Sequence, residues 1–479
     1  MTSGPTLLEQ LSAFAANVTY ESLPTEVAAS VKDRVLDTLG ICLAAVPLDT
    51  SRMATELAAS WGGPEQATVV GLPLRLPAIG AAFVNGVLAH SLDFDDTHLP
   101  SVLHPSACVI PTALAVGETV GVSGEAVIAA AAAGYEVTIR TGMAAYDRAL
   151  GNSVFFEDGW HATSICGTLA AAVIAAKLYG MGAHGIGNAL GIAVSMGSGV
   201  IEGNRAGGSV KRLHCGWAAH AGIAAAQAAR AGFTGPMSAF EGRFGFYQAF
   251  CRGRFDPSQI TRGLGTEWSV PGVFYKPYPA NHFTHAAIDA ALALRESVNV
   301  NDIADIELRV ASPTLRTIAE PAEAKARPLS GYHAQFSGPF VVATALLGGG
   351  GLGVSLDDFT DQRVSDPRYL ELAAKVRCVA DPECDAIFPN QFPAILRVRT
   401  RSGTVLEQKV LSNRGGPGNP LSAEELKLKF SINAARVLEP SAASELAAMI
   451  GEMGKYSIEE LMAPMARATA DRRPAASPA

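Results

Sequence analysis

Residues 124–145 read GEAVIAAAAAGYEVTIRTGMAA, a long run of small and apolar residues. Glu136 and Arg140 interrupt this run, which is therefore more typical of a helix in a protein core than of a membrane span. Alanine and glycine dominate it, and small side chains let the axes of neighbouring helices approach closely. The stretch predicts a tight helical bundle in which some helices are fully buried.

The same small-residue pattern recurs across the first 265 residues, which read as helical almost throughout. Apolar residues recur at helical spacing in each of these segments. The clearest are PAIGAAFVNGVLAHSLD (77–93), PSACVIPTALAVGETV (105–120), GTLAAAVIAAKLYG (167–180) and WAAHAGIAAAQAARAGF (217–233).

The pattern changes after about Thr266. IADIELRV (303–310) alternates apolar and charged residues as a half-buried strand does, and AILRVRTRSGTVLEQKVL (394–411) reads as two strands joined at Ser402-Gly403. Ser422 and Glu425 then form a capping box that opens a new helix. We therefore predict a mainly α fold with a helical domain over 1–266, an α/β domain over 267–421 and a helical return over 422–479, which ends in a polar tail, RRPAASPA (472–479).

The composition limits the classes of protein to which the chain can belong. The chain has 479 residues, of which 48% are hydrophobic and 17% charged, and its net charge is −8. No basic run is present, so nucleic acid is not expected as a partner. The N-terminus lacks a cationic region followed by an apolar one, so we predict no secretory signal, no membrane partner and a cytoplasmic location. The seven cysteines are scattered, which favours reduced thiols over a zinc site or a disulfide framework.

The most polar stretch in this apolar half is HSLDFDDTHLPSVLHPS (90–106), which holds three histidines and three aspartates. If SLDFDDTH ends a helix, Asp93 and Thr97 fall on one face, at positions i and i+4. His104 comes just before Pro105 and an apolar helix. We therefore expect His104 to lie at a helix N-terminus.

Three more segments place basic residues at helix starts. They contain His161 in DGWHATSICG, Lys211 and His214 in SVKRLHCG, and Lys276, His282 and His285 in YKPYPANHFTH. Helix N-termini carry free N–H groups and favour anions, and a nearby Lys or protonated His strengthens this preference. Several such ends brought together would bind a small polycarboxylate, and imidazoles can serve as acid or base near pH 7.

Other interpretations of these residues are open. His90 and Asp95 are more often simple caps than functional groups. The DDTH carboxylates resemble aspartate-rich surfaces that hold Mg²⁺ through phosphates, but HExxH spacing is absent, so we predict no metal. The glycine patterns at 185–199 and 348–353 lack the context of a dinucleotide site or a phosphate-binding loop.

The strings AHSLDFDDTH, HPSACVIP, GWHATSICG, KRLHCGWAAHAG and KPYPANHFTHAAIDA resemble the MmgE/PrpD family, in order and over most of the chain. That family includes 2-methylcitrate dehydratase, cis-aconitate decarboxylase and iminodisuccinate epimerase. The resemblance implies a helical domain built from both ends of the chain, with a smaller α/β lid inserted. It also implies a cytoplasmic homodimer that needs no metal or organic cofactor, with its active site between the two domains.

The resemblance also implies the site residues. Carried over position by position, the catalytic set is Asp93, Thr97, His104 and His161, and the substrate-binding set is Lys211, Lys276, His214, Asn281 and His285. Two positions depart from the decarboxylase pattern, because Phe340 stands where some members have Tyr and Asn281 where decarboxylases have His.

The leading hypothesis from sequence is a lyase that dehydrates a 2-methylcitrate-like hydroxy acid, with proton transfer next to a carboxylate. Decarboxylation of the cis-aconitate type and epimerisation of the iminodisuccinate type need the same proton transfer and stay open. Two hypotheses from other classes are a Mg²⁺-dependent enzyme that uses the DDTH carboxylates and a carboxylate-binding protein without turnover.

Overall fold

The computed structural model describes residues 4–203 and 208–467, so the predicted polar tail at 472–479 lies outside the described residues. The chain forms two compact units. Unit 1 comprises Met1–Val273 and Phe430–Ala479, and unit 2 comprises Phe274–Lys429. Unit 2 thus begins and ends a few residues after the α/β domain that the sequence predicts at 267–421.

Unit 1 is helical, as the sequence predicts. Its longer helices are α1 (Leu7–Asn17), α2 (Thr25–Ala45), α3 (Asp49–Ser60), α4 (Ala78–His90), α5 (Ser106–Val120), α6 (Gly124–Ala144), α8 (Ala162–Leu178), α9 (Ala183–Ala193) and α11 (Val210–Arg230). Short elements connect them: β1 (Ala67–Thr68), β2 (Arg75–Leu76), β3 (Tyr146–Asp147), β4 (Asn152–Ser153), α7 (Val154–Glu157), α12 (Phe246–Cys251) and α13 (Ser258–Thr261).

Glycine and alanine allow these helices to pack closely, as their composition predicts. A Cβ added at Gly216 of α11 would lie 2.3 Å from the Phe83 carbonyl oxygen of α4, and one at Gly222 would lie 2.4 Å from the Ala171 Cβ of α8. These distances are too short for any side chain at either glycine. The helix α6, which contains the opening stretch, is buried along almost its whole length. The bundle therefore holds the ends of α4, α8 and α11 at fixed positions.

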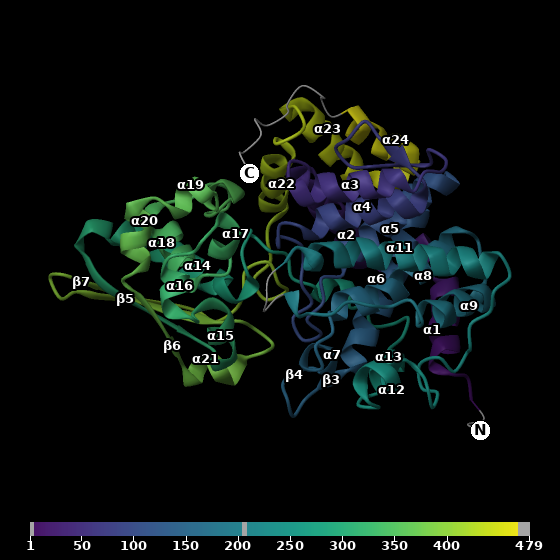
Figure 1. Cartoon of the computed structure of the whole chain (residues 1–479), viewed down its shortest axis with the longest axis horizontal. Coiled ribbons are helices and arrows are strands. Elements are labelled where there is room, and N and C mark those ends of the chain that lie inside the picture. Colours follow the sequence, from purple (N-terminus) through teal and green to yellow (C-terminus); the bar gives the residue numbers. More distant parts are fainter. Residues whose placement is uncertain (1–3, 204–207, 468–479) are drawn as a thin grey trace. The chain divides into compact units, whose positions relative to one another are not determined.

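The end of the chain returns to unit 1. Ser422 and Glu425 form the expected capping box at the start of α22 (Ala423–Ala434), with the Glu425 N–H donating to Ser422 Oγ and the Ser422 N–H donating to Glu425. The helix α23 (Pro440–Gly451) then packs against α2, and α24 (Ile458–Met462) packs against α5. Figure 1 shows these yellow C-terminal helices beside the purple N-terminal ones.

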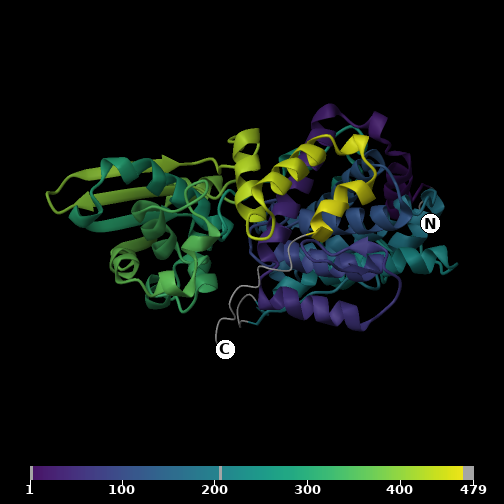
Figure 2. The same ribbon diagram turned by 90° about the horizontal axis from the view of Figure 1, so that it is seen from above.

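Unit 2 is an α/β unit with a four-stranded sheet. Its strands are β5 (Ile303–Val310), β6 (Val376–Ala380), β7 (Ala394–Thr400) and β8 (Val405–Val410), in the order β6-β5-β7-β8. The pair β5–β6 is parallel, and β5–β7 and β7–β8 are antiparallel. The sheet packs against α14 (His285–Leu294) and α18 (Gly338–Leu347), and Figure 2 shows strands and helices of this unit as two layers.

Smaller helices complete unit 2. They are α15 (Leu315–Ile318), α16 (Ala322–Ala326), α17 (Gly331–Ala334), α19 (Asp361–Val364), α20 (Pro367–Ala373) and α21 (Pro382–Ile387). The strand β5 was predicted from the alternating pattern of IADIELRV, and the hairpin of β7 and β8 turns at Gly403, whose φ of +89° is readily adopted by glycine.

One local prediction is wrong. The helix α4 ends at His90, so SLDFDDTH does not continue it and Asp93 and Thr97 do not share a helical face. Asp93 instead adopts a φ of +51°, in the left-handed region that a non-glycine residue rarely enters. A run of three carboxylates that each need a cationic or hydrogen-bonding partner is better satisfied by an irregular segment than by one helix face.

Candidate functional site

The three aspartates after α4 are buried, and each contacts a basic side chain from a different helix. Asp93 contacts Lys211 of α11, Asp95 contacts His90 of α4, and Asp96 contacts Arg34 of α2. Buried charges are costly unless they are paired, so these contacts explain how an apolar chain accommodates so many acidic groups in one segment.

The pair of Asp96 and Arg34 is the most enclosed. Their charged atoms are 2.6 Å apart and both side chains are 1% exposed. Arg34 also donates to the carbonyl oxygens of Val270 and Val273, and Asp96 accepts from the backbone N–H and the hydroxyl of Ser106. Burial raises the pKa of Asp96, while Arg34 and Ser106 oppose that shift. This pair fixes the segment against α2 and the start of α5.

Asp93 reaches Lys211 from its left-handed backbone conformation. Lys211 Nζ donates to Asp93 Oδ1 at 3.0 Å, and the lysine side chain is 15% exposed. A non-glycine residue in this region costs on the order of 1–3 kcal/mol, and such strain is concentrated at functional sites. The geometry holds an ammonium group in place beside the segment.

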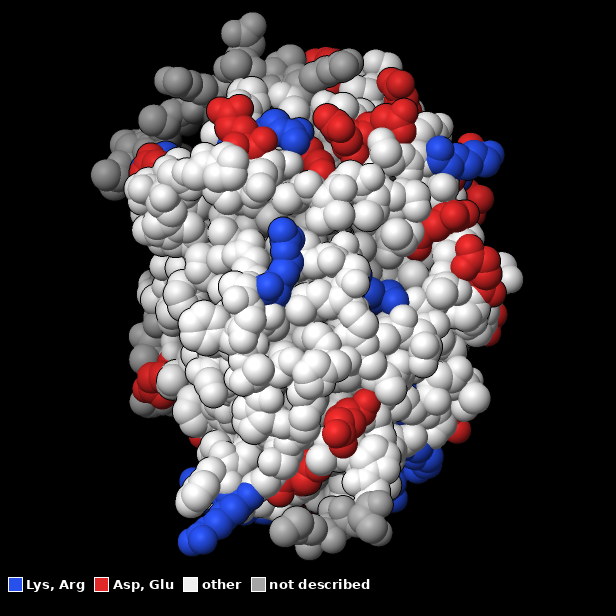
Figure 3. Space-filling model, turned by 90° about the vertical axis from the view of Figure 1, so that its right-hand side faces the viewer, with Lys and Arg blue, Asp and Glu red and all other residues white. Residues whose placement is uncertain are grey.

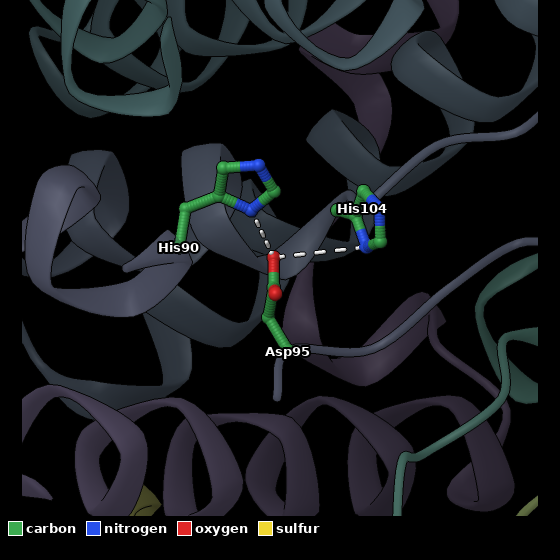
Figure 4. A group of neighbouring side chains, drawn as sticks. All are labelled: His90, Asp95 and His104. Atoms are coloured by element: carbon green, nitrogen blue, oxygen red, sulfur yellow. Dashed lines mark hydrogen bonds and ion pairs between the residues drawn. The ribbon is translucent and has the colours of Figure 1, made fainter. Parts of the chain in front are cut away.

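Asp95 faces two imidazoles, as Figure 4 shows. Its Oδ2 atom lies 2.7 Å from His90 Nδ1 and 3.8 Å from His104 Nδ1. Because a carboxylate accepts hydrogen bonds, the Nδ1 atom of His90 carries a hydrogen. Asp95 and His90 therefore form a buried pair, and neither is the simple helix cap that its sequence position favoured.

His104 is held by its backbone and its ring. Its N–H donates to Thr163 Oγ1 at 3.1 Å, and its Nδ1 atom lies 2.9 Å from the Asp96 carbonyl oxygen and 3.4 Å from Thr97 Oγ1. Since the carbonyl can only accept, Nδ1 carries a hydrogen, and Nε2 is the atom that gains or loses a proton. The ring has the fixed tautomer expected of a general acid or base.

His161 and His214 form a second imidazole pair. His161 is the N-cap residue of α8, and its Nδ1 atom lies 3.0 Å from the Nδ1 atom of His214 on α11. Two nitrogens can share one hydrogen bond only if one of them lacks a hydrogen, so at least one ring is neutral. Burial lowers the pKa of His214 to about 4 and that of His161 well below its usual value, with nearby His90 and Lys211 adding to both shifts.

These groups lie in one cluster of unit 1. The ring centre of His90 lies 5.1 Å from that of His104 and 5.6 Å from that of His161. The ring centre of His161 lies 5.0 Å from that of His214. The structure thus brings together all the site residues that the sequence placed in this unit. They are Asp93, Thr97, His104, His161, Lys211 and His214.

The remaining predicted residues belong to unit 2. Lys276 is buried there at 1% exposure, and the His285 Nε2 atom lies 3.0 Å from the Ala280 carbonyl oxygen. The Asn281 side chain accepts from the Phe283 N–H and so caps the short 3₁₀ turn η3 (His282–Thr284). Asn281, which stands where decarboxylases are expected to have a histidine, therefore has a local structural role in this chain.

Phe340 has a packing role. It is fully buried in the core of unit 2, and its ring is stacked on Tyr369 with centroids 6.1 Å apart. An aromatic ring that fills a core site needs no hydroxyl. The presence of Phe rather than Tyr at position 340 therefore carries little information about which reaction the chain catalyses.

Sequence reasoning missed several members of the cluster. Arg34 lies in α2 within VKDRVLDTLG, where three other residues are also charged, so no local signal distinguished it. Ser106 and Tyr135 extend the Asp96 network through a hydrogen bond of 2.5 Å between their hydroxyls. His90 and Asp95 were noticed but assigned to caps.

Among residues 4–203 and 208–467, one group of side chains could hold a metal ion. A donor atom from each of His90, Asp95 and His104 lies within 4.8 Å of the others. Two imidazoles and one carboxylate suit zinc rather than Mg²⁺, which prefers oxygen ligands. The Nδ1 atoms of His90 and His104 already donate to Asp95 and to the Asp96 carbonyl, so a metal bound at these two atoms would have to replace these hydrogen bonds.

Within the described parts of the chain, no helix combines the length and the hydropathy required to cross a bilayer.

Comparisons with known proteins identify the family. The MmgE/PrpD N-terminal domain matches residues 9–258 and the MmgE/PrpD C-terminal domain matches residues 278–453. The chain is 30% identical to cis-aconitate decarboxylase of Homo sapiens over 85% of this chain and 83% of that protein. It is 24% identical to cis-aconitate decarboxylase of Aspergillus terreus, with 90% of each chain covered, and 26% identical to 2-methylcitrate dehydratase of Cupriavidus necator, with 86% of each covered. The chain belongs to the MmgE/PrpD family.

Proposed function

We propose that this chain is a lyase that acts on a small di- or tricarboxylic acid by transferring a proton next to a carboxylate. The observation that carries the proposal is the cluster of His104, His161, His214 and Lys211 around three buried aspartates. The relatives named cis-aconitate decarboxylase and 2-methylcitrate dehydratase are enzymes of this type.

The first candidate reaction is decarboxylation of an unsaturated tricarboxylate such as cis-aconitate. Relatives with that name match most of this chain, and the buried position of Phe340 removes one argument against it. In this reaction the bond between carbon and the departing carboxylate breaks, its electron pair stays on the substrate, CO₂ leaves, and the carbon receives one proton. His104 supplies that proton from Nε2, and solvent restores it afterwards.

The other residues bind and orient the substrate. Lys211, held by Asp93, attracts a substrate carboxylate, and neutral His161 donates a hydrogen bond to a second one. Thr97 and Asp93 keep His104 and Lys211 in position. Lys276, Asn281 and His285 of unit 2 are proposed as further contacts to the carboxylates, on the strength of the family resemblance. A buried, apolar surrounding strengthens each of these electrostatic interactions.

Dehydration of a 2-methylcitrate-like hydroxy acid is the second candidate. Asn281 favours it, because this residue cannot exchange a proton where decarboxylases are expected to have an imidazole. Here His104 removes a proton from carbon and returns it to the leaving hydroxyl, toward which neutral His161 donates a hydrogen bond, so that water is lost and an alkene forms.

We also propose that the chain forms a homodimer in the cytoplasm and uses no metal or organic cofactor. Figure 3 shows one face of the molecule on which most side chains are uncharged and the acidic ones lie mainly toward the upper and right-hand edges, with a few in the lower part. Depletion of charge is typical of the centre of a protein–protein interface. Light scattering coupled to size exclusion tests this part, and a monomer at micromolar concentration would contradict it.

A substrate panel followed by NMR tests the activity. The panel is cis-aconitate, 2-methylcitrate, citrate and iminodisuccinate, and the readouts are CO₂ release, alkene signals and deuterium incorporation from solvent. We expect turnover of one member, its loss by at least about 100-fold in His104→Asn, and wild-type rates in the exposed control His184→Asn.

The panel also tests the competing classes. Loss of activity after chelation would support a metal-dependent enzyme. Binding of these acids without turnover, with His104→Asn weakening binding only, would support a carboxylate-binding protein. No binding and no turnover with any member would contradict the proposal.

A further inference from the structure

A buried tyrosine of unit 2 uses its hydroxyl both as a donor and as an acceptor. Tyr278 is 0% exposed, and its hydroxyl donates to Asp289 Oδ1 of α14 at 2.6 Å. Arg414 Nη1 donates to the Tyr278 hydroxyl oxygen at 2.9 Å. Because an arginine can only donate, the tyrosine oxygen accepts from Arg414 and its own hydrogen goes to Asp289. Tyr278 thus links α14 to the loop that contains Arg414.

The sequence around Tyr278 explains why a side chain makes this link. Tyr278 lies between Pro277 and Pro279, in an irregular segment of unit 2. Proline has no backbone N–H, so neither neighbour can anchor the segment by donating a backbone hydrogen bond. The same segment carries Lys276 and Asn281, which are proposed to contact the substrate carboxylates. The contacts of the Tyr278 side chain therefore anchor the backbone between these two residues.

The Tyr278 ring also contacts the first residue of α14. The ring centroids of Tyr278 and His285 lie 5.4 Å apart, in an edge-to-face arrangement. His285 and Asp289 are four residues apart in α14 and so lie on one face of the helix, where Tyr278 contacts both. The third residue of unit 2 that is proposed to bind the substrate is therefore packed against the same tyrosine.

Arg414 belongs to a loop that approaches the Tyr278 segment closely. Its Nη2 atom donates to Glu425 on α22. The next residue, Gly415, accepts from the Tyr275 N–H at 2.9 Å and has a φ of +96°. A Cβ at Gly415 would lie 2.2 Å from the Tyr275 carbonyl oxygen, so only glycine allows this approach. The two segments are thus joined by the backbone at Tyr275 and by the side chain of Tyr278.

We propose that Tyr278 is a positioning residue, whose contacts to Asp289 and Arg414 keep the substrate-binding residues of unit 2 in the arrangement that receives a carboxylate. The inference rests on the proposed function, in which those residues contact the substrate. Groups that are held in place before a ligand arrives bind it better, because ordering them on binding costs free energy. Loss of the hydroxyl should therefore weaken substrate binding rather than slow the proton transfer. The residues positioned in this way are Lys276, Asn281 and His285.

Tyr278→Phe tests this role, because it keeps the ring against His285 and removes the hydroxyl that joins Asp289 to Arg414. We expect KM for the substrate to rise about 10-fold while kcat stays within about twofold, as loss of ground-state binding predicts. Asp289→Asn keeps an oxygen that accepts from Tyr278, so its KM should stay near the wild-type value. Asp289→Ala removes that acceptor and should raise KM as Tyr278→Phe does.

The matched control is Tyr369→Phe. Tyr369 on α20 is also buried in unit 2, and its hydroxyl accepts from Arg363 Nη1 at 2.9 Å, the same length as the bond between Arg414 and Tyr278. No proposed site residue lies in α20. Tyr369→Phe should leave KM and kcat at their wild-type values, which separates the positioning role from the general effect of losing a buried hydroxyl.

A second set of readouts needs no turnover. Calorimetry with tricarballylate, a saturated tricarboxylate without a hydroxyl group, should show about 10-fold weaker binding to Tyr278→Phe than to the wild type. Tyr369→Phe should bind it as the wild type does. Hydrogen exchange of the Tyr275 and Asn281 amides, which donate backbone hydrogen bonds of 2.9 and 2.8 Å, should become faster in Tyr278→Phe and not in Tyr369→Phe.

The outcomes distinguish this inference from the proposed function. Weaker tricarballylate binding and faster exchange in Tyr278→Phe support the inference even if no member of the panel is turned over. Unchanged KM and affinity in a folded Tyr278→Phe overturn it even if the wild type is an active lyase. Faster exchange with unchanged affinity also overturns it, because the hydroxyl would then have a structural role only. If Tyr278→Phe does not fold, Asp289→Ala and Asp289→Asn decide by the same measurements.

Discussion

Replacement of Arg34 by methionine tests whether the buried ion pair holds the acidic segment in place. Arg34 donates to Asp96 at 2.6 Å and to the carbonyl oxygens of Val270 and Val273 at 3.1 and 2.7 Å. In Arg34→Met the aspartate keeps its contacts to Ser106 but loses the cation, while both carbonyls lose a donor. Removal of one partner from a buried pair costs about 3–5 kcal/mol. We expect the free energy of unfolding to fall by that amount.

The measurement is urea unfolding followed by circular dichroism, with two further variants. Arg34→Met/Asp96→Asn should recover part of the loss, because a neutral amide is less costly to bury than an unpaired carboxylate. The control Arg52→Met removes an exposed pair with Glu56, in which the side chains are 57% and 64% exposed. Its expected cost is below about 0.5 kcal/mol. A loss below about 1 kcal/mol in Arg34→Met would refute the reasoning, since the pair would then be dispensable for the fold.

Three further predictions concern substrate binding, pH and packing. Lys211→Met should raise KM for a polycarboxylate about 10- to 100-fold with folding intact by circular dichroism, and an unchanged KM would contradict its role. His214 has a pKa of about 4 when folded, below its unfolded value, so unfolding binds a proton and stability should fall as pH drops from about 6.5 to 4. His214→Asn should make that slope shallower in urea titrations, and an unchanged slope would count against a neutral buried His214. Gly216→Ala should destabilise unit 1 by at least about 1–3 kcal/mol, because its Cβ would meet a backbone oxygen, whereas Gly451→Ala meets nothing within 4 Å and should be near neutral in thermal unfolding.

Much of the architecture follows from local patterns in the chain. The small, apolar residues of the unit 1 helices predict that these helices are buried. The alternation of apolar and charged residues in IADIELRV predicts the strand β5. The positions of His161 and His285 at helix starts were also visible, because glycine-rich or polar breaks precede each apolar run.

The site could be predicted less completely, because its contacts join distant parts of the chain. The contact of Arg34 with Asp96 spans 62 residues and that of Lys211 with Asp93 spans 118. No local sequence pattern predicts which residues form such distant ion pairs. The backbone of Asp93 was misjudged for a related reason, since its left-handed conformation follows from the partner it must reach rather than from its neighbours in sequence.

The pairing of each acidic group with a different helix has a consequence for how the enzyme matures. An early folding intermediate that lacked α11 would leave Asp93 without its ammonium partner, and one that lacked α2 would leave Asp96 without its guanidinium. Catalytic competence should thus arise late and all at once during synthesis, and a chain cut between α4 and α11 should regain turnover only when both fragments reassociate.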